Sequence, residues 1–403
     1  MSLYYFDANP NKKILFKRDN NGREISYYFF NDVIACGEDL FYPNTLLMTI
    51  NKKIYKPLRE NTMSLKNAKG FDNEFHIKCD FKYDSIDEDN NFFFVYNTDN
   101  YYHFVYDTLP YLITYKELKK EYPNLKLLMN YPNSSKDNFY TFVLEFLELS
   151  DINKSDIKII KKDTLYKNLI ISTSYTHDID SNLPPREEIY NFFKNYKTLD
   201  YKKTPKKIYV SRRSWVHGNF SNIGTNYTTR RKMVNEDALV ELLNSHGFQE
   251  VFTENLSTIQ KINYFKNAEI VVGAIGGGIC NVLFSNNKCK LIALISPTFL
   301  NVNERFKYSL DRVDLHTFEH TKHTESKEFK TFMRVQIGTI IGEIISIEND
   351  CVTISYSDTK VSGWNNDIKY KTMTVPISEC TKLDEGLNSP WEIDLVKFKQ
   401  AFL

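Results

Sequence analysis

The stretch NAEIVVGAIGGGICNVLFSNNKCKLIALIS, at Asn267–Ser296, decides the fold class of this 403-residue chain. It holds two short apolar runs rich in β-branched residues, 269–274 and 290–295, which predict buried strands. Between them, the consecutive glycines 276–278 predict a tight loop, and a short helix follows over 279–284. A strand, a loop, a helix and a second strand in this order are typical of a parallel α/β sheet.

The same alternation continues upstream of this stretch. Strands and helices are predicted in turn, in the chain order 207–210, 235–245, 248–253 and 257–267. Asn235 and Ser257 stand at N-cap positions, where a polar side chain can accept from the first turn of a helix. The segment from about 206 to 300 therefore predicts a doubly wound parallel sheet.

The flanking segments differ in character. The first 200 residues mix predicted strands (92–97, 125–129 and 169–173) with predicted helices (102–122 and 139–149). Pro110 is expected to lie in the first turn of the 102–122 helix or to break it. From residue 331 onward, β-branched residues alternate around Asn349-Asp350, which predicts a small antiparallel β unit with a turn at that pair. The last piece, 390–402, predicts a terminal helix.

Composition excludes several classes of protein. Lys and Arg number 52 against 51 Asp and Glu, which leaves a net charge of +1 and argues against a nucleic-acid binder driven by bulk charge. The six cysteines are scattered and form no CxxC pair, so neither a disulfide framework nor a zinc site is expected. Neither a signal peptide nor a membrane span is recognisable, and we expect a cytoplasmic protein.

Two features predict an anion-binding pocket. The glycine loop 276–278 follows a strand and precedes a helix, a geometry that brings backbone N–H groups toward an anion. Arg212 and Arg213 follow the strand 207–210, and ligands of open α/β sheets bind beyond the carboxyl ends of strands. The alternatives are a tight turn made for packing and a solvated arginine pair. The loop is not the GxGxxG fingerprint, because Ile275 stands where a glycine is needed, so a nicotinamide enzyme is disfavoured.

Several ordered motifs carry a family resemblance. They are SRR (Ser211–Arg213), RRKMVNED (Arg230–Asp237), GFQEVFTENLSTIQKINYFKNAEIVVGAIGGGICNVLF (Gly247–Phe284) and, upstream, DNYYHFVYDTLPYL (Asp99–Leu112). Over roughly residues 90 to 300 the chain resembles the family 61 glycosyltransferases. The clearest departure is Ile275, which replaces the histidine of the family's G-x-H-G-A motif.

The resemblance implies a GT-B architecture of two Rossmann-like domains. These would be an acceptor-side domain over 1–200 and a nucleotide-sugar domain over 201–330, followed by a small β-rich extension with the terminal helix over 331–403. It also implies an inverting glycosyltransferase that moves a sugar from a nucleotide-diphosphate donor, taken here as a UDP-sugar, to a glycan hydroxyl. Neither a metal nor another cofactor is expected, and the expected partners are only the donor and the acceptor.

The resemblance also implies site residues. His103 and Asp107 are the expected catalytic pair, since residues four apart share one face of a helix. Asp107 is either the base itself or the group that orients His103. Their ordinary explanations are a carboxylate near a helix N-terminus and a histidine at the edge of the core. The expected donor-binding residues are Arg212, Arg213, Asn235, Glu236, Glu254, Gly273, Gly276, Gly277, Gly278 and Asn281.

Other hypotheses stay open. The missing histidine at Ile275 makes a catalytically inactive relative, serving as a glycan- or partner-binding scaffold, the main alternative. The triplets Asp178-Ile179-Asp180 and Asp87-Glu88-Asp89 resemble metal-binding DxD motifs, but short acidic triplets are common by chance. His316, His320 and His323 recur at helical spacing, yet their polar surroundings favour an exposed segment over a metal site.

Overall fold

A computed structural model describes most of the chain. The described residues are 4–6, 11–20, 22–36, 46–49, 53–55, 83–94, 101–131, 138–161, 163–176, 185–197, 204–213, 233–285, 289–297, 306, 309–310, 313–323, 329, 331, 333–357, 370–383 and 390–403. The chain divides into two compact units, Met1–Lys197 and Thr198–Leu403.

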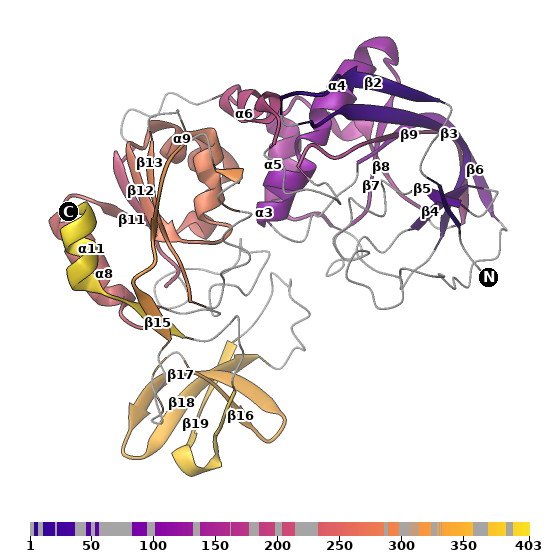
Figure 1. The fold of residues 1–403 in the computed structure, drawn as a ribbon. Coiled ribbons are helices and arrows are strands. Elements are labelled where there is room, and N and C mark those ends of the chain that lie inside the picture. Colours follow the sequence, from indigo (N-terminus) through magenta and orange to yellow (C-terminus); the bar gives the residue numbers. More distant parts are fainter. Residues whose placement is uncertain are drawn as a thin grey trace. The chain divides into compact units, whose positions relative to one another are not determined.

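The first unit contains a seven-stranded mixed sheet (Figure 1). Its strand order is β2-β3-β9-β6-β7-β8, and β4 also pairs with β3. The strands β9, β6, β7 and β8 run parallel, whereas β2, β3 and β4 pair antiparallel. The bounds are β2 Lys12–Phe16, β3 Ile25–Cys36, β4 Leu46–Thr49, β6 Ser85–Phe93, β7 Lys126–Met129, β8 Ile157–Ile159 and β9 Thr164–Ser172. A separate parallel pair joins β1 (Tyr4–Phe6) to β5 (Lys53–Tyr55).

The helix predicted over 102–122 is divided in the structure. A short turn, α3 (Tyr101–His103), leads into a π-helical turn over Phe104–Thr108, and α4 (Tyr111–Glu121) follows. Pro110 is the N-cap of α4, because proline has no N–H to continue a helical hydrogen-bond ladder. The other helices of this unit are α5 (Thr141–Leu149) and α6 (Glu187–Lys194), with a 3-10 turn over Lys154–Asp156.

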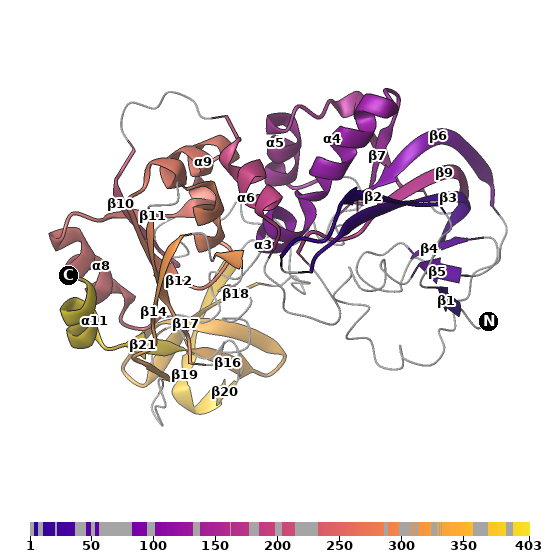
Figure 2. The ribbon, with the colours of Figure 1, turned by 45° about the horizontal axis from the view of Figure 1, so that its top comes forward.

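The second unit contains the predicted parallel sheet. All five strands run parallel in the order β11-β10-β12-β13-β14. They span Lys207–Val210 (β10), Gln249–Val251 (β11), Ile270–Ala274 (β12), Lys290–Leu294 (β13) and Asp314–Phe318 (β14). The helices α8 (Glu236–Ser245) and α9 (Thr258–Asn267) cover opposite faces of the sheet (Figure 2). A mixed α/β fold with parallel sheets, and the alternation predicted from 207 to 295, are thereby confirmed.

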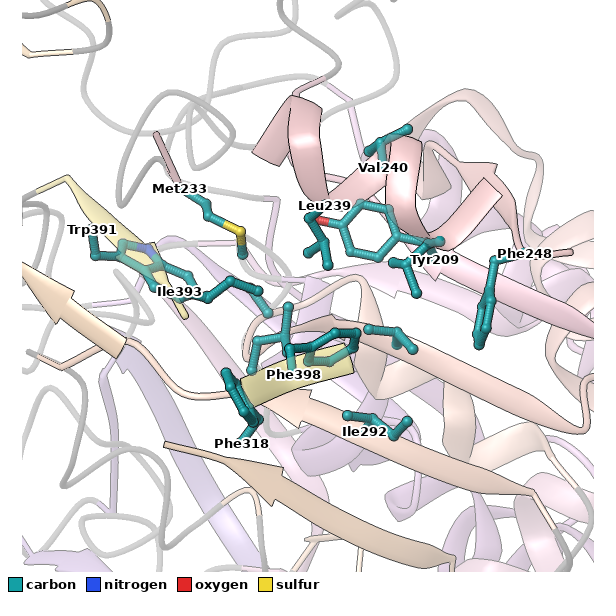
Figure 3. Close-up of a cluster of buried hydrophobic side chains, with 14 residues drawn as sticks. Tyr209, Met233, Leu239, Val240, Phe248, Ile292, Phe318, Trp391, Ile393 and Phe398 are labelled. Carbon is teal, nitrogen blue, oxygen red and sulfur yellow. The ribbon is translucent and has the colours of Figure 1, made fainter. Parts of the chain in front are cut away.

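The C-terminal segment completes the core of this parallel sheet. β21 (Trp391–Ile393) pairs antiparallel with β15 (Thr321–His323), and α11 (Leu395–Phe402) follows. Trp391 and Phe398 are fully buried in one cluster with Tyr209 and Ile292 of the sheet (Figure 3). The sequence groups 390–403 with the β-rich extension, whereas the structure packs it against the sheet and α8.

The β-rich segment itself forms an antiparallel sheet in the order β19-β18-β17-β16-β20. The strands are Arg334–Ile337 (β16), Ile340–Glu348 (β17), Cys351–Ser357 (β18), Tyr370–Pro376 (β19) and Thr381–Lys382 (β20), with a 3-10 turn over Ile377–Glu379. Asn349 and Asp350 have positive φ angles of 49° and 60°, which confirms the predicted turn. This sheet has its own core, which includes Val335, Ile344, Val352 and Ile354. In chain order, this sheet lies between β15 and β21, so it is an insertion between two strands that pair with each other.

Replacement of Phe398 by alanine tests the role of the C-terminal helix. Phe398 is fully buried, so Phe398→Ala is expected to lower the free energy of unfolding by about 3–5 kcal/mol. Val396 lies on the same helix and is 67% exposed, so Val396→Ala should change it by less than about 0.5 kcal/mol. Urea titrations of the two variants make the comparison. Equal stabilities would show that α11 is not part of the core.

Among the helices that the structure describes, none is long and apolar enough to cross a membrane.

Candidate functional site

The order of the parallel strands in the second unit marks a place for a ligand. From β10 the chain moves to β11 on one side and then to β12 on the other side. The direction of winding therefore reverses between β10 and β12. Ligands of doubly wound sheets bind at such a switch point, outside the carboxyl ends of the strands.

Two of the predicted residues meet at this switch point. Arg212 follows β10, and Gly276 follows β12. A Cβ atom built on Gly276 would stand 2.8 Å from Nη1 of Arg212, so the guanidinium lies directly against the glycine loop. The loop is also packed on the end of β10, since a Cβ on Gly278 would stand 2.7 Å from Cγ1 of Val210. Glycine is needed here for close approach of the backbone.

A buried carboxylate fixes the main chain beneath Arg212. Oε1 of Glu236 accepts from the Tyr209 hydroxyl at 2.9 Å, the Ser211 hydroxyl at 3.0 Å and the Arg212 amide at 2.8 Å. Burial and the neighbouring Glu236 raise the pKa of Tyr209 well above its usual value, so this hydroxyl stays a neutral donor. Glu236 thus sets where the chain leaves β10.

Arg213 has a different environment from Arg212. Its Nε and Nη2 atoms donate to the two carboxylate oxygens of Glu250 at 2.6 and 2.8 Å, and Nη1 donates to Asp237. The hydrogen-bonded Glu250 raises the pKa of Arg213 above its usual value. The guanidinium therefore joins the end of β10 to β11 and α8.

The other predicted donor residues surround the loop or anchor its neighbours. Asn281 donates from Nδ2 to the Gly278 carbonyl at 2.9 Å and closes the loop. Glu254 lies in the 3-10 turn Thr253–Asn255 directly after β11, at the same edge of the sheet. Asn235 occupies the N-cap position of α8 without a side-chain capping bond. Its amide pairs instead with the backbone of Ile393, at 2.8 and 3.2 Å.

Two glycine substitutions separate ligand binding from packing. Gly276→Ala is expected to push the flexible end of Arg212 aside and weaken the binding of an anionic ligand by about 1–2 kcal/mol, or roughly 5- to 30-fold. Gly273→Ala places a Cβ 2.6 Å from Ile279 and 3.1 Å from Cβ of Val210, which should cost about 1–3 kcal/mol of stability. Titration calorimetry and thermal unfolding distinguish the two effects. A Gly276→Ala protein with unchanged affinity would contradict the prediction that Arg212 and the glycine loop together bind an anion.

The first unit has a switch point of its own. From β6 the chain proceeds to β7 and β8 on one side and returns to β9 on the other side, parallel to β6. His103 and Asp107 lie on the helical segment after β6, and Thr176 follows β9. The carboxyl ends of β6 and β9 are therefore the candidate place for a second group of reacting side chains.

The side chains of His103, Asp107 and Thr176 form a hydrogen-bonded network. Nδ1 of His103 lies 2.7 Å from Oδ2 of Asp107, and the Thr176 hydroxyl donates to Oδ1 of Asp107 at 2.7 Å. Asp107 is 7% exposed, and the His103 side chain is 18% exposed. Asp107 and His103 are joined by a π-helical turn, a feature that is frequent at functional sites.

This network determines which tautomer of the neutral His103 ring is favoured. A carboxylate that accepts from Nδ1–H holds the neutral imidazole in the tautomer whose Nε2 carries the lone pair. Nε2 can then accept a proton from a hydroxyl group. Both oxygens of Asp107 already accept hydrogen bonds, so its geometry suits orientation better than proton transfer.

The aromatic residues around His103 belong to the core. Tyr102 and Tyr106 stack at a ring-centroid distance of 5.6 Å, and both are buried. Phe104 is fully buried against Phe94 and Phe142. These rings hold the helical segment in place and do not form an open sugar-binding face.

The alternative metal motifs have other surroundings. Asp87 and Asp89 both pair with Lys158, and His316 lies on β14 beside Asp314 rather than on a helix. Asp178 and Asp180 lie outside the described residues. Within the described part of the chain, no three His, Cys, Asp or Glu side chains are grouped so that they could hold a metal ion.

The sequence model of the Glycosyltransferase 61 family matches residues 101–292. This range begins at α3, two residues before His103, and ends within β13, so it includes both switch-point sites. The resemblance inferred from the motifs is confirmed. No curated protein matches the chain.

Proposed function

Since residues 101–292 match the sequence model of the Glycosyltransferase 61 family, whose members are glycosyltransferases, we propose that this protein is an inverting glycosyltransferase. It takes a sugar from a nucleotide-diphosphate donor, a UDP-sugar, and transfers it to a hydroxyl group of a glycan. The proposal includes the GT-B organisation that the resemblance implies, with the donor bound by the second unit and the acceptor by the first.

One observation carries the proposal. Each unit places side chains whose chemistry suits acid–base catalysis or anion binding at the carboxyl ends of the two strands that flank its own topological switch point. In the second unit these are Arg212 and the loop that contains Gly276. In the first unit they are His103 and Asp107. A transferase needs an anion site for the leaving diphosphate and a base for the acceptor, and the two sites supply these chemistries separately.

The donor half of the reaction is assigned to Arg212. The C–O bond between the sugar and the diphosphate breaks as the acceptor attacks, and negative charge develops on the leaving phosphate. An arginine fork can bind two phosphate oxygens and stabilise this charge. Glu236 and Asn281 act as positioning residues, because they hold the Arg212 backbone and the glycine loop. Arg213 is assigned to the same positioning group, since it is engaged by Glu250 and Asp237.

The acceptor half is assigned to His103. Its Nε2 takes the proton of the acceptor hydroxyl while the oxygen attacks the anomeric carbon from the face opposite the diphosphate. Asp107 keeps the imidazole in the required tautomer and stabilises the imidazolium that forms. Between the two roles left open for Asp107, the orienting role is therefore the one proposed. Neither half of this chemistry requires a metal ion.

A ligand screen followed by a product assay tests the proposal. UDP and a panel of UDP-sugars are expected to raise the thermal unfolding temperature, because a ligand that binds only the folded state stabilises it. Glycan products are then sought by mass spectrometry with the stabilising donor and a panel of oligosaccharide acceptors. If no nucleoside diphosphate or nucleotide-sugar stabilises the protein, the proposal is wrong.

The inactive-relative alternative rests on Ile275. This residue is buried, and its amide donates to the Leu294 carbonyl, so an apolar side chain replaces the family's imidazole at the end of β12. In that case the donor would bind and neither its hydrolysis nor its transfer would be detected. Turnover that disappears in the His103→Ala protein excludes this alternative.

A further inference from the structure

We propose that Thr176 is a positioning residue of the His103–Asp107 site, and this inference rests on the proposed function. The threonine hydroxyl donates to Oδ1 of Asp107 at 2.7 Å, while Oδ2 receives His103 at 2.7 Å. The two contacts hold the carboxylate from both of its oxygens. Thr176 thereby fixes the plane of the carboxylate and, through it, the ring of His103.

Thr176 follows β9, whereas His103 and Asp107 follow β6. Ser172 is the last residue of β9, and its hydroxyl lies 3.1 Å from the hydroxyl of Thr114 on α4. The Thr114 hydroxyl also lies 2.8 Å from the hydroxyl of fully buried Tyr175. This buried network ties the segment after β9 to the helix that follows the π-helical turn. The backbone at Thr176 is therefore fixed beside the carboxyl ends of β6 and β9, where the switch point lies.

A local turn sets the direction of the Thr176 side chain. The Thr176 amide donates to the Ser174 hydroxyl at 3.2 Å, a side-chain turn of the kind that serine commonly forms. The backbone beside Asp107 is thus fixed before the threonine hydroxyl makes its own contact. A free rotation of Thr176 away from Asp107 would leave a buried carboxylate oxygen without this donor, which is unfavourable.

The consequence for the reaction is specific. A buried carboxylate with a hydroxyl donor on one oxygen has one preferred orientation for the other oxygen. Without the hydroxyl, the Asp107 carboxylate can turn away from His103, which weakens the contact with Nδ1–H, and His103 can then populate both neutral tautomers. Only the tautomer with its proton on Nδ1 presents Nε2 as a base. Loss of the Thr176 hydroxyl should therefore act on kcat through His103 and leave donor binding unchanged.

Three variants test this role. Thr176→Val removes the hydroxyl at nearly constant volume and is expected to lower kcat by about 10- to 100-fold, the usual effect of removing a group that orients a functional histidine. The KM for the donor should change by less than about twofold. Thr176→Ser keeps the hydroxyl and should restore most of the activity. Thr164→Val, at the opposite end of β9, removes a hydroxyl that contacts Ser85 and should leave kcat unchanged.

A second measurement does not depend on transferase activity. In protein labelled with ¹⁵N in its histidines, the His103 signals are assigned by their loss in His103→Ala. Wild type, Thr176→Ser and Thr164→Val should show the neutral ring protonated on Nδ1, whereas Thr176→Val should show a mixture of tautomers. If Thr176→Val keeps the wild-type tautomer and kcat, the proposal is overturned. If the tautomer changes but wild type transfers no sugar, the positioning role stands and the proposed function fails.

Discussion

The Arg212→Ala protein is expected to bind UDP about 10- to 150-fold more weakly than the wild type. A hydrogen bond to a charged group contributes roughly 1.5–3 kcal/mol, and each 1.4 kcal/mol is a factor of ten in affinity. Arg212 lies against the glycine loop at the switch point of the parallel sheet, so its guanidinium is the side chain best placed for the diphosphate. Titration calorimetry with UDP measures the change. Arg212→Lys should recover only part of the loss, since an ammonium group cannot bind two oxygens as a fork.

Arg213→Ala is the matched control for this experiment. The two arginines are adjacent in sequence, but Arg213 is committed to Glu250 and Asp237. Its loss should lower the free energy of unfolding, because the carboxylate of Glu250 is largely buried and would lose the two hydrogen bonds from Arg213. The affinity for UDP should change by less than about threefold. The reverse pattern, with Arg213 controlling affinity and Arg212 controlling only stability, would refute the assignment.

The parallel sheet could be predicted well from the sequence because its signals are local. The strands β10, β12 and β13 are short, mostly apolar runs, and each helix begins at a polar residue. At Ser257 the structure contains a full capping box with Gln260. The glycines 276–278 likewise mark a loop by their lack of side chains. Such features need no knowledge of distant parts of the chain.

Local sequence signals do not predict which core the C-terminal segment packs against. The periodicity of 390–402 predicts a helix but does not say which core receives its apolar face. In the structure Trp391, Ile393 and Phe398 pack with residues near positions 209 to 318, and an independent β sheet separates these parts of the sequence. The inserted sheet does not change the hydrophobic pattern of the strands on either side of it. Sequence order alone therefore places the terminal helix with the β-rich segment rather than with the parallel sheet.

The candidate site residues could be inferred from the sequence, but the role of each residue could not. Motif order pointed to His103, Asp107, Arg212 and Glu236 as candidates, but a motif does not state which way a side chain points. The adjacent arginines point to different neighbours, since Arg213 pairs with Glu250 on β11 and Arg212 lies against the glycine loop, and the sequence does not show this difference. Thr176 was missed, because it follows β9 and lies 69 residues from its partner Asp107. Its only local signal is its place shortly after a predicted strand, at 169–173.

The largest effect on turnover is expected for His103→Ala. A positioned general base typically contributes about 10²- to 10⁴-fold to the rate, so kcat should fall by that factor. The donor should still bind with nearly wild-type affinity, because His103 belongs to the first unit and Arg212, the residue proposed to bind the donor, belongs to the second. Steady-state assays with a saturating acceptor, together with calorimetry for UDP, separate the two quantities.

Asp107→Asn distinguishes the two roles considered for the carboxylate. An asparagine can still bond to the ring, but its amide nitrogen is a donor, so it favours the tautomer with the proton on Nε2 and removes the base. If Asp107 orients His103, both single variants and the double variant should lose activity to a similar extent, because residues that act as one unit are not additive. If Asp107 is itself the base, the His103→Ala protein should retain most of its activity while Asp107→Asn does not. The first outcome is expected, since each oxygen of Asp107 already accepts one hydrogen bond, from His103 and from Thr176.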